Sequence, residues 1–196
     1  MDYNGILQNI SKHISLNDEE TGYFTSLLIH KKINRKDLLL KEGQSCKAIS
    51  YVGSGALRAF HTDKGGKEST IMFAISDWWI TDMYCFITEQ PAMQNIIAIE
   101  DSEIWQLQKQ DLDRLYAAVP KFERFFRIIM QNAYIREQLR VLQSLSLSVE
   151  ERYDIFMHKY PQLIPHLTQK QIASYLGITP EFLSGLRKNK AKSKIS

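Results

Sequence analysis

The stretch TQKQIASYLGITPEFLSGLRK, residues 168–188, has the pattern of two short helices joined at a glycine. The Thr168 side chain can accept a hydrogen bond from a backbone amide of the first turn, and the Gln171 side chain can accept one from the Thr168 amide. This pair of bonds is a capping box. Thr179, followed by a proline, marks a second helix start. Gly177 between the two patterns can adopt the positive φ that a tight turn requires. We therefore predict a helix-turn-helix.

The composition of this stretch supports two packed helices beside a basic segment. Ala173 is small enough to let two helix axes approach closely. The apolar contacts would come from Ile172, Leu176, Ile178, Leu183 and Leu186. Residues 161–196 hold six basic residues and one acidic residue, a net charge of +5, which suits phosphates. An ordinary helical hairpin with a solvated lysine tail is the alternative.

The whole chain has the composition of a globular protein. Its 196 residues are 44% hydrophobic, enough for one large or two small packed domains. No apolar run approaches the ~18 residues of a membrane span, and the N-terminus lacks the order of a signal peptide. We expect a cytoplasmic protein that has no contact with a membrane.

Chemistry-bearing motifs are scarce. Cys46 and Cys85 lie far apart, and the five histidines show no ligand-like pairing, so we expect no metal site. The chain has no nucleophile elbow, Walker loop, HExxH motif or dinucleotide-binding glycine fingerprint. We expect that the protein is not an enzyme.

The part of the chain before the helix-turn-helix combines helices with many short strands. Residues 4–30 have a helical pattern, with a second start at Asn17. From about residue 32, β-like runs alternate with glycine-rich turns. The predicted strands are residues 38–40, 48–52, 56–61, 69–74, 96–99 and 103–107. Such spacing predicts an α+β fold built on a small antiparallel β-roll with flanking helices.

A long helix is predicted to follow a short one over residues 109–118. Pro120 can start it, and the pattern continues to about Leu145. Alternating spacings of three and four define a coiled-coil seam, which predicts a symmetric homodimer. The seam residues are Phe125, Ile128, Asn132, Ile135, Leu139 and Leu142. A second apolar strip would pack on the roll: Phe122, Phe126, Ile129, Met130 and Ala133. The alternative is a helix buried wholly within one subunit.

These patterns predict three units along the chain. Residues 1–119 would form a sensor roll with N-terminal helices, residues 120–146 a dimerisation helix, and residues 147–196 the helix-turn-helix domain. Ser148 and Glu151 form another capping box at the start of the third unit.

This order of elements resembles the Crp/Fnr family of bacterial transcription regulators. The resemblance rests on KEGQSCKAISYVGSGALRAFHTDKGGKES, residues 41–69, and on the helix-turn-helix stretch, and it covers nearly the whole chain. It implies a roll like that of cyclic nucleotide-binding domains, a homodimer along the long helix, and effector-dependent binding to palindromic double-stranded DNA. RNA polymerase is a further candidate partner.

The resemblance fails at the phosphate-binding cassette. Family members that bind cyclic AMP carry a Gly-Glu pair followed by Arg-Ser, and residues 77–107 contain neither pair. Residues 68–108 hold no Lys, Arg or His but seven acidic residues, whereas a buried phosphate needs a charge-assisted donor. We expect loss of cyclic-nucleotide binding and no bound cofactor. A small-molecule effector of unknown identity could instead contact Arg58, Trp78, Trp79, Tyr84 and Phe86.

The second helix of the motif also departs from better-known members, which have an arginine where this chain has Gly185. Groove-facing candidates are Thr179, Glu181, Ser184 and Arg187, with Gln169, Lys170, Lys188 and Lys190 nearer the phosphates. Thr168 is a further DNA-binding candidate. Glu181 could accept from a cytosine or only stabilise the helix dipole. Only NKAKSKIS is expected to follow the helix, as a flexible arm without the family's β-wing. The leading hypothesis is a DNA-binding regulator; the alternative is a small-molecule sensor, conceivably of cyclic nucleotides, or an interaction protein with weak or lost operator recognition.

Overall fold

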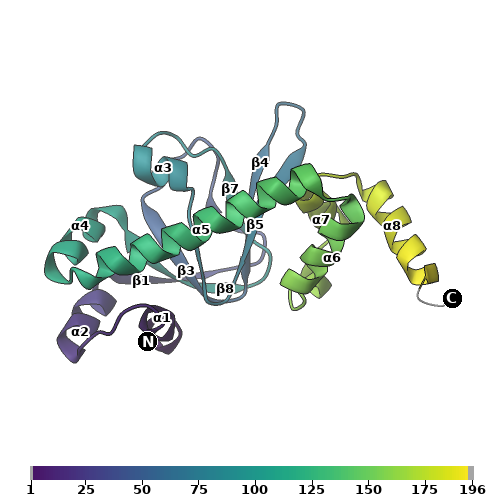
Figure 1. Cartoon of the computed structure of the whole chain (residues 1–196). Helices are drawn as coiled ribbons and strands as arrows, with labels where there is room; N and C mark the ends of the chain where they lie inside the picture. The colour runs from purple at the N-terminus through teal and green to yellow at the C-terminus, as the bar shows by residue number, and fades with distance from the viewer. Residues whose placement is uncertain (1, 194–196) are drawn as a thin grey trace.

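The computed structural model describes residues 2–193, which form helices, then a two-sheet roll, then helices again (Figure 1). The N-terminal helices are α1 (Asn4–Ser11) and α2 (Asp18–Ser26). The roll consists of β1 (Leu28–Ile33), β2 (Leu38–Leu40), β3 (Ala48–Ser54), β4 (Ala56–Thr62), β5 (Glu68–Ile75), β6 (Trp78–Ile80), α3 (Met83–Thr88), β7 (Asn95–Ala98) and β8 (Ser102–Gln108). The C-terminal part consists of α4 (Lys109–Ala118), α5 (Lys121–Ser146), α6 (Val149–Lys159), a short 3-10 turn (Ile164–His166), α7 (Gln169–Leu176) and α8 (Pro180–Ser193).

The roll is made of two antiparallel sheets of four strands, in the orders β1-β8-β3-β6 and β2-β7-β4-β5. Val52, Leu57 and Ile104 belong to the apolar cluster between the sheets, and none of the three is exposed. Because side chains alternate along a strand, the same strands also present apolar residues outward. Both outward faces therefore need a cover.

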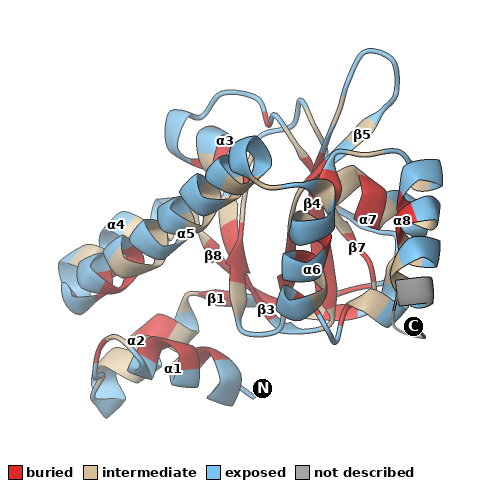
Figure 2. Ribbon diagram, turned by 45° about the vertical axis from the view of Figure 1, so that its right-hand side comes forward, coloured by how far each residue is buried: buried red, intermediate tan, exposed pale blue. Residues whose placement is uncertain are grey.

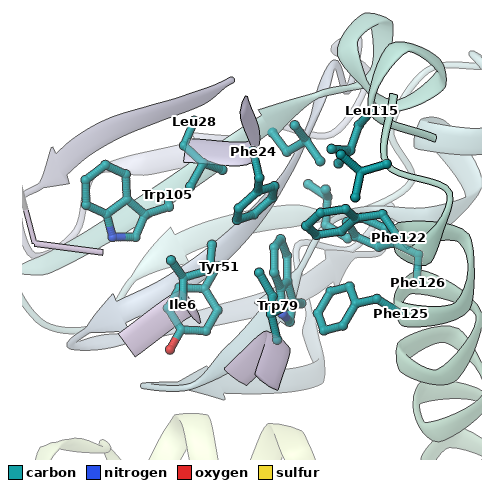
Figure 3. Close-up of a cluster of buried hydrophobic side chains, with 14 of the residues drawn as sticks. Ile6, Phe24, Leu28, Tyr51, Trp79, Trp105, Leu115, Phe122, Phe125 and Phe126 are labelled. Atoms are coloured by element: carbon teal, nitrogen blue, oxygen red, sulfur yellow. The ribbon is translucent and has the colours of Figure 1, made fainter. Parts of the chain in front are cut away.

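Helices α1, α2, α4 and the first part of α5 cover the outward face of the first sheet. Figure 3 shows Phe122, Phe125 and Phe126 of α5 gathered beside Trp79, with Phe24 of α2 near Phe122. The Phe24 and Phe122 rings stack with centroids 4.6 Å apart. This aromatic cluster fixes the N-terminal end of the long helix on the roll.

The C-terminal helices cover the outward face of the second sheet. Phe73 of β5 is fully buried, and its ring contacts Phe156, Tyr160 and Tyr175 of the helical part. Ala56 and Ile99 of the roll belong to the same cluster. The third predicted unit thus shares an apolar core with the first.

The predicted fold class is confirmed, and all six predicted strands are present with small differences at their ends. The predicted helix over residues 4–30 is wrong at its end, because Leu28–Ile33 pairs with β8 as a strand. Strand β6 and helix α3 were not predicted, since each is short and held by tertiary contacts. The expected flexible arm is also wrong in part, because α8 continues to Ser193.

The long helix has one side on the roll and one side in solvent (Figure 2). The predicted roll-facing strip is confirmed, since Phe122 and Phe126 are buried and Ile129 and Met130 pack against the same cluster. The seam prediction is wrong for Phe125, which is fully buried within its own chain. The exposed apolar side chains of this helix are Tyr134, Ile135, Leu139, Val141, Leu142 and Leu145.

Replacing Phe73 with alanine tests the packing of the C-terminal helices on the roll. The change removes a fully buried ring and leaves a cavity, so we expect the free energy of unfolding to fall by roughly 3–5 kcal/mol. Chemical denaturation measures this. Phe182→Ala is the control, because Phe182 is 51% exposed and its loss should cost no more than about 0.5 kcal/mol. Equal losses in the two variants would contradict the shared core.

Candidate nucleic-acid interface and effector cavity

Local hydrogen bonds fix the helix-turn-helix at both helix starts. The Thr168 Oγ1 accepts from the Gln171 amide at 3.2 Å, and the Gln171 Oε1 accepts from the Thr168 amide at 2.9 Å. The Thr179 Oγ1 accepts from the Phe182 amide at 3.2 Å at the start of α8. Gly177 has φ +72°, the left-handed conformation that ends α7. The predicted caps and turn are confirmed.

The residues predicted to contact DNA fall into two groups. Six are exposed at helix starts or along α8: Thr168, Gln169, Lys170, Thr179, Glu181 and Lys188. Ser184, Arg187 and Lys190 are half-buried. The Arg187 Nε donates to the Tyr153 hydroxyl at 3.2 Å, and the Lys190 Nζ donates to Asp154 at 2.6 Å, so both also fasten α8 to α6.

Sequence reasoning missed Phe182, an exposed aromatic residue in the first turn of α8. Leu183 and Leu186 define the buried side of this helix, and Phe182 lies off that side. An exposed phenyl ring suits an apolar contact such as a thymine methyl group. Helical periodicity could have identified it, because the residue is apolar at a position that the buried pattern does not use.

The first helix of the motif is hydrogen-bonded to the roll. The Ser174 Oγ donates to the Glu68 carbonyl at 2.7 Å and accepts from the Thr70 amide at 2.9 Å. Beside it, the buried Arg58 guanidinium donates to the Glu68 carboxylate at 2.7 Å and to the Thr70 hydroxyl at 2.8 Å. Arg58 therefore belongs to the contact between roll and helices.

A cavity of about 620 Å³ lies between α5 and the mouth of the roll. Of the five residues predicted for an effector pocket, Trp78 and Trp79 line it. Arg58, Tyr84 and Phe86 are absent from its lining, so the structure does not bring the five together. Eight further lining residues are apolar: Ile49, Ile71, Met72, Ile80, Met83, Ile129, Met130 and Ala133. The cavity suits a largely apolar ligand.

A buried carboxylate accepts hydrogen bonds from backbone amides in the region of the missing phosphate cassette. Asp82 is 1% exposed, and its Oδ1 accepts from the Cys85 amide at the start of α3. Its Oδ2 accepts from the amides of Met93 at 2.7 Å and Gln94 at 3.1 Å. The Asp82 carboxylate is therefore the anion that these amides bind. Without it, the free amides would favour a bound anion such as phosphate.

Comparisons with known proteins agree with this architecture. Residues 30–118 match the family model of the cyclic nucleotide-binding domain. The chain is 24% identical over 186 residues to the anaerobic regulatory protein of Haemophilus influenzae, covering 88% of this chain and 71% of that protein. It is 24% identical over 195 residues to the fumarate and nitrate reduction regulatory protein of Vibrio cholerae, covering 92% and 76%. A Crp/Fnr-family structure from Eubacterium rectale superposes with a TM-score of 0.73 at 16% identity, covering 90% of this chain and 85% of that one.

The fold and these matches define a protein with a cyclic nucleotide-binding domain followed by a helix-turn-helix. In sequence and fold, the chain is similar to regulators of the Crp/Fnr family. The relatives named above are regulatory proteins, not enzymes. The domain match describes the fold of the roll, while the phosphate cassette itself is missing from the sequence.

Two further observations concern residues 2–193. No helix in this part of the chain combines the length and the apolar character needed to cross a bilayer. No three or more His, Cys, Asp or Glu side chains gather there in a way that could hold a metal ion.

Proposed function

We propose that this protein is a homodimeric, effector-responsive transcription regulator that binds double-stranded DNA through α7 and α8. The proposal is supported chiefly by the capped helix-turn-helix, whose second helix begins with the exposed residues Thr179, Glu181 and Phe182. Exposed Lys170 and Lys188 add positive charge on the same two helices. Neutralising phosphates releases counterions, which supplies much of the affinity for DNA.

The exposed side of α5 is the proposed dimer interface. Ile135, Leu139 and Leu142 are 55%, 51% and 59% exposed in the single chain. Burying such a row against its symmetry copy removes apolar surface from water on both helices. Tyr134, Val141 and Leu145 would widen the contact. RNA polymerase is proposed as a further partner once the dimer is on DNA.

The roll cavity is the proposed effector site. It touches α5 at Ile129, Met130 and Ala133, so an occupant would contact the same helix that forms the dimer. A ligand that favours one position of this helix would shift the population of dimer geometries. Since Asp82 already uses the nearby amides, we propose an effector other than cyclic AMP or cyclic GMP.

Binding to promoter DNA from the gene's own neighbourhood tests the regulator proposal. In gel shifts over a range of salt, we expect Lys188→Ala to weaken binding to all sequences and to lower the salt slope by about 1. Lys64→Ala is the matched control, because Lys64 is an exposed lysine in the β4–β5 hairpin and should leave binding unchanged. A wild-type protein without sequence preference at moderate salt would instead favour a sensor that has lost operator recognition.

Sedimentation velocity tests the dimer. Leu142→Glu should shift the protein toward monomer, because the symmetry places two like charges in an apolar interface. Gln90→Glu adds the same charge at an exposed position in the loop after α3 and should sediment as wild type. An unchanged dimer in Leu142→Glu would show that α5 does not form the interface.

Titration calorimetry tests the effector class. We expect no saturable low-micromolar binding of cyclic AMP or cyclic GMP, because the Arg58 guanidinium of the roll is already paired with Glu68 and Asp82 holds the amides. A cyclic-nucleotide receptor measured under the same conditions is the positive control. Low-micromolar binding by this protein would contradict the proposed loss.

A further inference from the structure

A second cleft, of about 630 Å³, lies between the C-terminal half of α5 and the helix-turn-helix domain. Its walls come from α5, from α6 and from the end of α7, with Ser69 and Thr70 of β5 and Trp78 of β6 at its base. It is distinct from the roll cavity in its main walls, although Trp78, Asn132 and Arg136 border both.

The two spaces differ in charge. Lys12 and Arg136 line the roll cavity together with Asp77 and Glu137, so opposite charges balance there. In the second cleft every charged residue of the described lining is basic: Arg136, Arg140, Arg152 and Lys159. Four cations around one hollow repel one another unless an anion lies between them.

Two of these cations donate hydrogen bonds to backbone carbonyls. The Arg140 Nη2 donates to the Thr70 carbonyl at 2.7 Å, and the Arg152 Nη1 donates to the Leu176 carbonyl at 2.9 Å. Both are neutral acceptors, which leave the charge in place. The nearest acidic contact is Glu137, whose Oε1 lies 3.9 Å from the Arg136 Nε.

Two of the arginines in this cleft also have a hydrogen-bond donor without a partner. The Nε atoms of Arg136 and Arg152 are buried and have no hydrogen-bond partner among the described residues. Such groups cost free energy unless a partner satisfies them. Burial lowers the pKa of the Lys159 ammonium, and the nearby charges of Arg136 and Arg140 lower it further against the opposing effect of Glu137.

Aromatic rings hold the cations in place. The Arg136 guanidinium lies over the Trp78 ring at 4.9 Å, and the Arg140 guanidinium lies over the Tyr175 ring at 4.6 Å. Stacked guanidinium groups lose less side-chain freedom when they bind an anion. The lining also includes Ile135, Leu139 and Ile155, which offer exposed apolar surface.

We propose that this cleft binds a polyanionic small molecule, a phosphate monoester or diphosphate with an apolar body, between the long helix and the helix-turn-helix domain. Arginine and lysine together match phosphate groups, and the volume lies within the range of small-molecule sites. An occupant would bridge α5 to α6 and α7, and so would stabilise the docked position of the DNA-binding helices.

Two alternative occupants of the cleft, DNA and a partner helix, fit less well. DNA is disfavoured because α8 lies on the far side of the domain from α5 (Figure 1). A partner helix on the proposed seam would border the cleft at Ile135 and Leu139, but the seam residues include no carboxylate to neutralise it. A small polyanion is therefore the occupant that best complements the four basic side chains of the cleft.

Titration calorimetry with inorganic pyrophosphate, at about 0.15 M salt, tests the site. We expect saturable binding by the wild-type chain and affinity about tenfold or more weaker in Lys159→Gln and in Arg136→Gln, since each loses a charge-assisted contact. Cyclic AMP, which carries a single negative charge, should bind far more weakly than pyrophosphate. Arg127→Gln is the matched control, because Arg127 is an exposed arginine of the same helix outside the cleft.

Thermal unfolding separates loss of the site from loss of the fold. Without pyrophosphate, Lys159→Gln should melt no lower than wild type, because it removes a partly desolvated charge that Arg136 and Arg140 repel. With pyrophosphate, the variant should lose the wild type's rise in melting temperature. Absence of pyrophosphate binding by wild type, or wild-type affinity in both cleft variants, would overturn the proposal. Competitive displacement by a DNA duplex would assign the cleft to DNA and overturn it too. None of these outcomes depends on operator recognition.

Discussion

Phe73 on the outward face of β5 is fully buried only because the C-terminal helices cover it. A sheet that is apolar on both faces must be covered on both. In this roll the two sheets cover each other's inner faces, so helices must cover the outward faces. The helix-turn-helix domain therefore serves as part of the core as well as a candidate DNA-binding module. Its position is fixed further by Ser174, which bonds the Glu68 carbonyl and the Thr70 amide. Any change that repositions the DNA-binding helices must break these contacts or move β5 with them.

The same constraint explains why the long helix has two different ends. Near its start, Phe122, Phe125 and Phe126 are buried against the roll, so this end is fixed within one chain. Further along, Leu139 and Leu142 are half exposed. Arg136 and Arg140 reach back to the roll there, at the Trp78 ring and the Thr70 carbonyl. A helix that is held at one end and free along its other apolar side is suited to respond to a second subunit, to an occupant of the roll cavity, or to one of the basic cleft.

Electrostatics distinguishes the two ligand spaces. The Asp82 carboxylate accepts hydrogen bonds from the backbone amides around α3, where a phosphate would otherwise be favoured, and this supports the proposed loss of cyclic-nucleotide binding in the roll. In the cleft beside α6, the reverse holds, because Arg136, Arg140, Arg152 and Lys159 face a space without a carboxylate in its described lining. Anion recognition by this chain is therefore proposed at the junction of its domains, outside the roll that the family uses for cyclic nucleotides.

The sequence by itself determined the elements whose signals are local. The capping boxes at Thr168 and Ser148, the turn at Gly177 and the glycine-punctuated strands depend on neighbours within a few residues, and the structure confirms them. Only the tertiary structure decided that Leu28–Ile33 is a strand, because pairing with β8 overrides its helical pattern. It also decided that Phe125 lies inside the core and that Arg58 holds Glu68 at the domain contact, away from the predicted pocket. Periodicity identifies an apolar side of a helix, but which partner covers that side depends on residues distant in the chain.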